Sequence, residues 1–159
     1  MAMKKIKNPF VHLDGYNCFG CAPDNPIGMK LTFAEEGDDI VSHWDADPAY
    51  QGWLNTLHGG IQSVLLDEIC GWAVMRKLQT AGVTSKMETR YLRPVKTDGR
   101  TVELRAHIES QRRNIVEVCA TLTDANGHLC TEARCIYFTF PPEKARRDMH
   151  FCGCELEEA

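Results

Sequence analysis

The longest apolar segment of the chain follows His58-Gly59-Gly60 and runs to about Gln79. Apolar residues recur along it with the spacing of one helical face, at positions 61, 64, 65, 69, 72 and 75. Four more apolar residues lie on its other faces, namely Leu66, Cys70, Ala73 and Val74. A helix that is apolar nearly all round is buried nearly all round. We therefore expect one long central helix, with Gly82 marking the region where it stops.

The pattern changes after this helix to an alternation of apolar and polar residues, which is typical of strands with one buried face. It predicts four strands, near residues 86–91, 102–109, 116–123 and 128–140. Short turns rich in Asp, Asn and Gly separate them, so we expect an antiparallel meander. Two further strands are expected before the helix, at 29–34 and 40–45, joined by a turn at 35–39. Residues 1–27 are punctuated by Pro, Asn and Gly and are expected to be irregular.

The order of these elements predicts the fold class. Two strands, a long buried helix and four more strands indicate an α+β protein in which one curved antiparallel sheet wraps around the helix. The length of 159 residues suits a single domain. We expect its core at about 16–140, an N-terminal arm at 1–15, and a charged, cysteine-containing tail at 143–159.

Composition narrows the class of function. The chain is 43% hydrophobic and 25% charged, with a net charge of -4, which argues against a general nucleic-acid binder. No apolar run is long enough to span a bilayer or to act as a signal peptide, so we expect no membrane contact and a cytoplasmic location. Disulfides are rare in that compartment, and the eight cysteines are therefore expected to act mostly as small buried hydrophobes.

Asp67 and Glu68 are the only charged residues between Gly59 and Met75. A buried carboxylate costs several kcal/mol unless it is paired or protonated. Their presence within an apolar helix therefore favours a functional role. The alternative is that one of the two faces solvent or a cation of a partner chain.

The glycines of His58-Gly59-Gly60 suit a close approach of another molecule to the start of the helix. The N–H groups of a first helical turn lack partners inside the helix and are able to stabilise a developing oxyanion. A plain junction between a loop and a helix is the alternative. Gly59 and Asp67 are eight residues apart, or about 12 Å along a helix. One carbonyl does not reach both within one chain, so a site that uses both residues is expected to be shared across a dimer.

Three parts of the sequence resemble hotdog-fold thioesterases of the phenylacetate-pathway type, within the 4-hydroxybenzoyl-CoA thioesterase superfamily. The resemblance covers about residues 16–140, and its most specific part is the spacing from His-Gly-Gly to the acid. The matching segments are Asn17-Cys18-Phe19-Gly20-Cys21 with Asn25-Pro26-Ile27-Gly28-Met29, Leu57-His58-Gly59-Gly60 with Leu65-Leu66-Asp67-Glu68, and Tyr91-Leu92-Arg93-Pro94-Val95. Two positions differ from the family pattern, Ala22 in place of a common Gly and Ile27 in place of a common basic residue.

The resemblance implies a homodimer, often paired again into a homotetramer, that hydrolyses an acyl-CoA to a free acid and coenzyme A. Asp67 matches the catalytic carboxylate, acting as general base or as nucleophile. Gly59 matches the oxyanion donor, and His58 has a supporting role in shaping the turn. Gln51 resembles a residue that orients the thioester or water, although other members have an asparagine at the position of Gly52. Glu68 is the alternative catalytic carboxylate if the helix turns Glu68, and not Asp67, toward the site.

Gly60 is expected to permit the substrate to approach the backbone closely. The phosphates of CoA need cations nearby as well. The candidates are Arg90 and Arg93, with Lys96, Arg112 and Arg113 as further basic residues near strand ends. Each of them is equally explained as a solvated charge. We expect no metal or cofactor to be required. The cysteine pairs Cys18/Cys21 and Cys152/Cys154, with His12 and His150, are an alternative zinc-ligand set.

Two other functions remain open from the sequence. One is a hydratase or dehydratase acting on acyl thioesters, which needs a histidine and an acid converging in one site. The other is a protein without catalysis, either a sensor that binds acyl-CoA or an interaction module stabilised by zinc. The product formed from an acyl-CoA separates the first from a thioesterase, and bound metal or ligand without turnover identifies the second.

Overall fold

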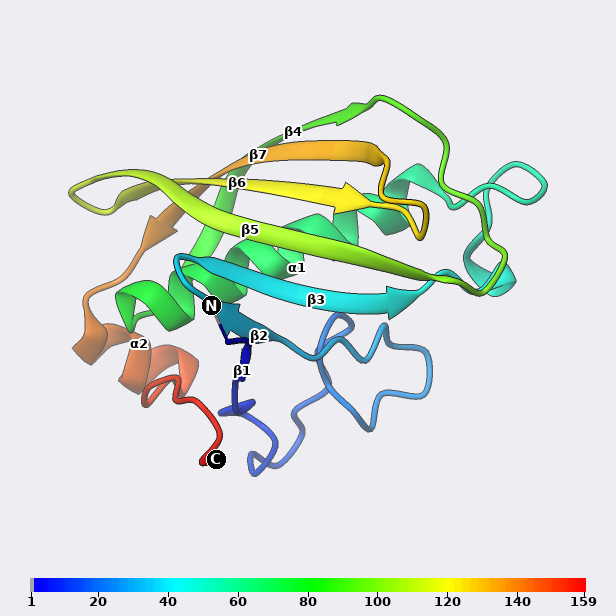
Figure 1. Cartoon of the computed structure of the whole chain (residues 1–159). Coiled ribbons are helices and arrows are strands. Elements are labelled where there is room, and N and C mark those ends of the chain that lie inside the picture. Colours follow the sequence, from blue (N-terminus) through cyan, green and yellow to red (C-terminus); the bar gives the residue numbers. More distant parts are fainter. Residues whose placement is uncertain (1) are drawn as a thin grey trace.

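The computed structural model describes residues 2–159 and confirms the α+β architecture (Figure 1). A long helix, α1 (Gly59–Leu78), lies against an antiparallel sheet with strand order β1-β2-β3-β5-β6-β7-β4. The strands are β1 (Lys4–Lys5), β2 (Ala34–Glu36), β3 (Asp39–Asp45), β4 (Gly82–Tyr91), β5 (Thr101–Arg112), β6 (Ile115–Thr123) and β7 (Leu129–Thr139). A short 3-10 helix (Pro48–Tyr50) precedes α1, and a second helix, α2 (Pro142–Met149), follows the sheet.

The predicted central helix is confirmed, with its start two residues earlier than the apolar pattern indicated. His58 caps the N-terminus, and Gln79 ends the helix in the left-handed conformation (φ 52°). Leu65, Leu66 and Ile69 are fully buried against the sheet. Among residues 2–159, no helix is long and apolar enough to cross a membrane.

The predicted meander is correct for β5, β6 and β7 but wrong for the first strand after the helix. β4 pairs with β7 at the far edge of the sheet, whereas β5 pairs with β3. Residues 92–100 therefore cross from one side of the sheet to the other, although Gly99 does form a turn within them (φ 79°). Alternation identifies a strand and its buried face, but it carries no information about which strand is the neighbour.

The strand predicted at 29–34 is also wrong, since β2 begins only at Ala34. Met29, Leu31 and Phe33 do alternate with exposed residues and point into the core. Their backbone, however, pairs with a neighbouring loop: the N–H of Met29 donates to the carbonyl oxygen of Phe19 at 2.8 Å. The positive φ of Lys30 (55°) is incompatible with an extended strand there.

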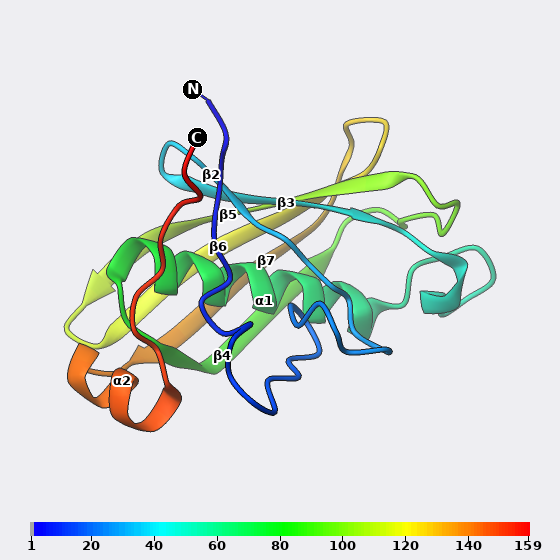
Figure 2. The same ribbon diagram turned by 90° about the horizontal axis from the view of Figure 1, so that it is seen from below.

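The two ends of the chain are more ordered than the sequence pattern indicated. β1 pairs with β2, and α2 forms within the tail that was expected to be only charged. Ile6 and Leu156 form a bridge, so the two ends run side by side across α1 (Figure 2). The N-terminal segment (residues 2–33) thus covers one face of α1.

Candidate active site

Asp67 projects from the half-buried face of α1 that lies nearest β4 and β7. Its Oδ1 accepts hydrogen bonds from the Thr84 hydroxyl and from the Tyr137 hydroxyl, each at 2.7 Å. The Tyr137 hydroxyl also lies 2.7 Å from the main-chain oxygen of Asp67. Burial raises the pKa of Tyr137, and the adjacent Cys70 and Asp67 act in the same direction. Tyr137 therefore remains a protonated donor that holds this carboxylate in one orientation.

Glu68 faces the other side of α1, toward the N-terminal segment. Its Oε1 accepts from the Trp72 indole N–H at 3.3 Å and from the Cys18 thiol at 3.4 Å. Within residues 2–159, no Lys, Arg or His side chain forms an ion pair with it. The two neighbouring carboxylates thus sit in different chemical surroundings.

The loop at residues 18–21 packs closely onto the Glu68 carboxylate. A Cβ at Gly20 would lie 2.3 Å from the Glu68 Cδ, so any larger residue here would displace the Glu68 carboxylate from its present position. The Cys21 sulfur is 2.8 Å from the Tyr16 hydroxyl. A hydrogen bond from the Cys21 thiol lowers the pKa of Cys18, assisted by the N–H groups of Cys21 and Gly20 and opposed by burial and by Glu68.

The zinc-ligand set considered from the sequence is not assembled in this structure. Cys18 and Cys21 lie together with Glu68, with their ligand atoms all within 4.8 Å of one another. Cys154 lies elsewhere, at the end of α1, where its backbone bonds to Gln79 and Arg76. The spacing of the cysteines gave no indication that a helix carboxylate lies beside the first pair.

At the start of α1, His58 Nδ1 accepts the N–H of Gly60 at 2.9 Å. The N–H of Gly60 is therefore occupied, whereas the N–H of Gly59 has no partner within residues 2–159. Tyr91 at the end of β4 donates its hydroxyl to the carbonyl oxygen of Gly59 at 2.8 Å, and Ser63 lies 2.9 Å from the same hydroxyl. These contacts fix the first turn of α1 to the edge strand.

Gly59 and Asp67 are thus both tied to β4, at its two ends. Tyr91 contacts Gly59, and Thr84 contacts Asp67. The helix between them is continuous, so the two residues stay about 12 Å apart along its axis. The structure does not bring them together within one chain. His58 and Asp67 do not converge either, because His58 caps the start of the same helix.

Gln51 lies in an exposed loop before α1. Its Oε1 accepts the backbone N–H of Asn55 at 2.9 Å, which fixes the orientation of this side chain within the loop. At the tip of this loop, Trp53 is 87% exposed and Leu54 is 79% exposed. The loop borders an open hollow of about 530 Å³ that reaches Gly59.

The candidate cations fall into two groups. Arg90 and Arg93 are close in sequence to Tyr91, at the Gly59 end of the sheet, and Arg90 pairs with Glu132 at 3.6 Å. Lys96 is in the segment that forms a bridge with Thr56, beside the hollow. Arg112 and Arg113 lie at the β5–β6 turn, at the opposite end of the sheet. The structure therefore separates Arg112 and Arg113 from the start of α1.

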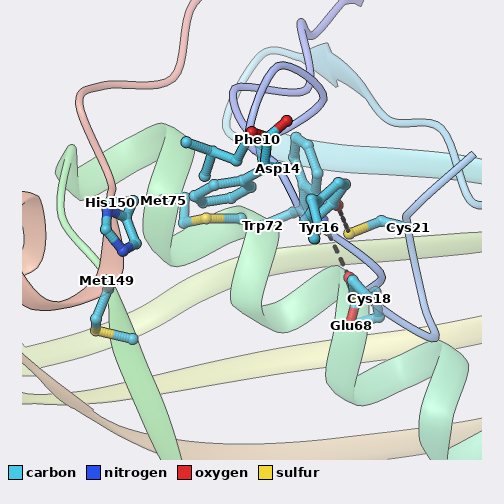
Figure 3. Close-up of a pocket in the computed structure, with 12 residues that line it drawn as sticks. Phe10, Asp14, Tyr16, Cys18, Cys21, Glu68, Trp72, Met75, Met149 and His150 are labelled. Carbon is cyan, nitrogen blue, oxygen red and sulfur yellow. Dashed lines mark hydrogen bonds between the residues drawn. The ribbon is translucent and has the colours of Figure 1, made fainter.

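A larger cavity of about 550 Å³ lies between the N-terminal segment and α1 (Figure 3). Glu68, Trp72 and Met75 line it from α1, and Phe10 and Tyr16 line it from the N-terminal segment. A second cavity of about 160 Å³ shares Glu68, Trp72 and Met75 and extends to Tyr137. Tyr137 thus lines the smaller cavity and contacts Asp67.

Three residues of this arrangement were not identified from the sequence, namely Tyr137, Thr84 and Tyr91. Tyr137 lies on the buried side of the alternation in β7, so a polar group on a predicted core face was a usable signal. Thr84 and Tyr91 are exposed residues of β4, and no pattern distinguishes them from other strand residues.

The sheet wrapped around α1 places the chain in the hotdog class. Residues 54–131 match the family model of the thioesterase superfamily. Acyl-coenzyme A thioesterase 13 of Mus musculus is 28% identical over 108 residues, covering 66% of this chain and 76% of that protein. The chain therefore has the hotdog fold and is similar in sequence to thioesterases of this superfamily, and these matches support acyl-CoA thioester hydrolysis as its general reaction.

Solved structures agree on the fold. A thioesterase superfamily protein has a TM-score of 0.71 and 22% identity, and the match covers 76% of this chain and 59% of that protein. This chain therefore spans less than two thirds of that protein's length. A hypothetical thioesterase from Streptococcus pneumoniae with coenzyme A has a TM-score of 0.64 and 21% identity, over 69% of this chain and 85% of that one. A putative thioesterase from Ralstonia eutropha, described as a phenylacetic acid degradation-related protein, has a TM-score of 0.62 and 19% identity, over 70% of this chain and 86% of that one.

Proposed function

We propose that the chain hydrolyses an acyl-CoA thioester in a site shared by two copies, with Asp67 as the catalytic carboxylate and the Gly59 N–H as the oxyanion donor. The observation that carries this proposal is that both groups are held at opposite ends of the same edge strand, β4. Each end presents one part of a site, and neither end is complete alone.

Asp67 has the surroundings that the reaction needs. Its Oδ1 is held by two hydroxyl donors, and no hydrogen bond from residues 2–159 occupies its Oδ2. The free oxygen is therefore available to take a proton from water, or to attack the thioester carbonyl and form a mixed anhydride that water then opens. In both cases the products are a free acid and the thiol of coenzyme A.

The Gly59 N–H supplies the second requirement, which is stabilisation of the negative charge on the carbonyl oxygen in the transition state. It is an unpartnered N–H at the positive end of a 20-residue helix. His58 supports it by occupying the adjacent Gly60 N–H, which fixes the geometry of the turn. Gly60 permits the His58 ring to lie close to the backbone of this turn, and the side-chain amide of Gln51 orients the thioester or water.

The edge strand suggests how the two parts meet. β4 bonds to β7 on one side only, and its other side is free to pair with a second copy. In an antiparallel pairing of two β4 strands around a two-fold axis between Met87 and Glu88, Thr84 of one copy faces Tyr91 of the partner subunit. That register puts Asp67 beside the first helical turn of the second copy. A homodimer is the smallest assembly that completes the site.

The substrate class follows from the two hollows. The cavity of about 550 Å³ between the N-terminal segment and α1, together with the cavity of about 160 Å³ that reaches Tyr137, suits an aryl or medium-chain acyl group. The open hollow at the loop of Gln51 suits the CoA portion, with Arg93 and Lys96 nearby for its phosphates. A neighbour in fold was solved with coenzyme A, which is consistent with this assignment.

The test uses one variant for each half of the site. Asp67→Asn removes the carboxylate, and Gly59→Pro removes the N–H and adds a proline ring. Proline suits the first helical position, and the extended conformation of His58 (ψ 132°) is compatible with a following proline. Gly59→Ala is the matched control, because it adds a Cβ at ordinary contact distance from Tyr91 and keeps the N–H.

The two inactive chains are co-expressed with different tags, and the mixed dimers are isolated. Each mixed dimer has one intact site of two, so coenzyme A release is expected at about half of the wild-type rate. Mixed dimers as inactive as both parents would exclude a shared site. Formation of a changed double bond without free thiol would instead identify a hydratase or dehydratase. Stabilisation by acyl-CoA without any turnover would identify a sensor.

A further inference from the structure

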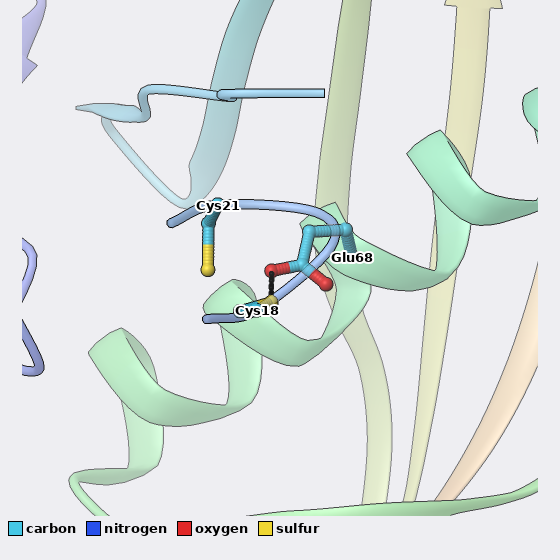
Figure 4. Close-up of side chains that lie close together, drawn as sticks. All are labelled: Cys18, Cys21 and Glu68. Atoms are coloured by element: carbon cyan, nitrogen blue, oxygen red, sulfur yellow. Dashed lines mark hydrogen bonds between the residues drawn. The ribbon is translucent and has the colours of Figure 1, made fainter. Parts of the chain in front are cut away.

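We propose that Cys18, Cys21 and Glu68 form a binding site for one Zn²⁺ ion that fastens the N-terminal segment to α1 (Figure 4). The three residues come from two distant parts of the chain, and their ligand atoms lie within 4.8 Å of one another. The site is separate from Asp67 and Gly59: it lines the cavity that we assign to the acyl group and does not contact the reacting atoms.

The donor set fits zinc in type and in spacing. Zinc binds thiolates at about 2.3 Å and carboxylates at about 2.0–2.2 Å in a tetrahedral arrangement, which puts ligand atoms roughly 3.5–3.8 Å apart. The Cys18 sulfur and Glu68 Oε1 are already 3.4 Å apart. Two soft sulfur ligands favour zinc over magnesium or calcium, which prefer oxygen.

The charge balance around Glu68 also indicates a cation. The side chain is half-buried at the wall of an apolar cavity, and no basic side chain in the described part of the chain pairs with it. Its bonding partners are one thiol and one indole N–H. A carboxylate beside two cysteines in such a place is stabilised by a metal ion more than by any contact present.

The groups around these three residues have the positions of outer-shell partners. The Trp72 indole N–H holds the Glu68 carboxylate, and the Tyr16 hydroxyl lies 2.8 Å from the Cys21 sulfur. Such contacts orient the ligands of a metal site and are a regular part of its construction. Gly20 permits the loop to approach the carboxylate, because a Cβ there would overlap Glu68.

The fourth position of the ion faces the cavity, which Cys18, Cys21 and Glu68 all line. A water molecule is the ligand we assign to it, because the chain supplies three donors here and zinc is bound tetrahedrally. The ion would join the two walls of that cavity, one from the N-terminal segment and one from α1. Zinc binding is therefore expected to stabilise the fold.

The experiment measures metal in the full chain without substrate, so its result does not depend on thioesterase activity. The protein is purified under reducing conditions, its zinc content is measured by mass spectrometry, and the chelator-treated protein is titrated with Zn²⁺ alone. We expect about one zinc per chain, affinity lower by at least about tenfold in Cys18→Ser and in Glu68→Gln, and a rise of Tm with zinc that these variants lose.

A second group of the same residue types provides the matched control. His107, Glu109 and Cys119 also lie within reach of one ion, but on the more exposed surface of β5 and β6, where His107 already pairs with Glu109 at 2.9 Å. Cys119→Ser is expected to bind zinc like the wild type. Zinc lost in Cys119→Ser but kept in Cys18→Ser would overturn the proposal.

Cobalt gives an independent readout in case a variant fails to fold. Co²⁺ added to the metal-free wild type is expected to produce the charge-transfer absorption of thiolate ligands, and the folded Glu68→Gln protein is expected to bind Co²⁺ more weakly. The reduced wild-type protein binding neither ion would overturn the proposal, as would a Cys18–Cys21 disulfide in a protein that takes up no zinc after reduction.

Discussion

Asp67 and Glu68 are neighbours in the sequence, yet α1 turns them toward different parts of the molecule. Asp67 faces the sheet edge, where hydroxyl groups of β4 and β7 hold it. Glu68 faces the N-terminal segment, where a thiol and an indole contact it. Successive helical residues point about 100° apart, so one step along the chain changes the whole environment of a carboxylate.

The difference shows why residue type alone does not assign a role. The Asp67 side offers an oriented carboxylate at the β4 edge of the sheet, which suits a reaction shared with a second copy. The Glu68 side is enclosed by the chain itself and carries sulfur ligands, which suits a metal ion and the wall of an acyl pocket. Four changes test this division, beginning with the largest expected effect.

Replacing Asp67 or Glu68 by its amide distinguishes the roles of the two carboxylates most directly. Asp67→Asn is expected to lower coenzyme A release by about 10²- to 10⁴-fold, because it removes the catalytic base or nucleophile. Glu68→Gln is expected to lower it by less than about tenfold, because Glu68 lines the acyl cavity and does not supply the reacting carboxylate. Release assays on both proteins, with circular dichroism to verify folding, provide the comparison. If Glu68→Gln alone lost coenzyme A release, Glu68 and not Asp67 would be the catalytic carboxylate.

A change on the Glu68 side is expected to alter the choice of acyl group. Met75 lines both cavities, and Met75→Trp fills part of their volume. We expect kcat/KM for aryl and medium-chain acyl-CoAs to fall by roughly 10- to 100-fold, with acetyl-CoA little affected. Met75→Leu conserves volume and serves as the control. An equal loss for all chain lengths would place the acyl group elsewhere.

On the Asp67 side, Tyr137→Phe removes one of the two hydroxyl donors. The remaining Thr84 bond keeps the carboxylate in place less firmly, so we expect kcat to fall by about tenfold with little change in KM. Stability should fall by about 1–3 kcal/mol, because the lost bond is to a charged group. Steady-state kinetics and urea unfolding measure the two effects. A change in KM alone would show that Tyr137 acts on substrate binding instead of on Asp67.

The smallest effect on activity is expected from a change that leaves the surroundings of both Asp67 and Glu68 intact. Glu35 on β2 bonds Arg76 and Lys77 near the end of α1, each at 2.9 Å. Burial raises the pKa of Glu35, but the bonds from Arg76 and Lys77 outweigh it and leave that pKa lowered. Glu35→Gln should cost about 1–3 kcal/mol of unfolding free energy and leave kcat unchanged.

The pH dependence of this stability has a defined sign. A carboxyl group whose folded pKa is lowered contributes stability above its unfolded pKa of about 4.3, and loses it as the pH falls through the folded value. The difference in unfolding free energy between wild type and Glu35→Gln should therefore be constant near neutrality and shrink below about pH 4. A difference that grows on acidification would contradict the assigned ion pair.

The sequence by itself determined the elements and the candidate chemistry. Apolar spacing identified α1, and alternation identified the strands from Asp39 onward with the buried faces of β5 and β6. The face predicted to be buried in β4 is only partly buried, and Tyr91 on it is exposed. These features are local, because the periods of a helix and a strand are properties of consecutive residues. The two carboxylates and the glycine turn before them were visible for the same reason.

Only the tertiary structure decided which of these residues share a neighbourhood. It put β4 beside β7, tied Tyr137 and Thr84 to Asp67, and brought Cys18 and Cys21 to Glu68. It also ordered the two ends of the chain, whose charged and irregular sequences carry little periodic signal. Such contacts join residues tens of positions apart, and they depend on how whole elements pack, which no local pattern records.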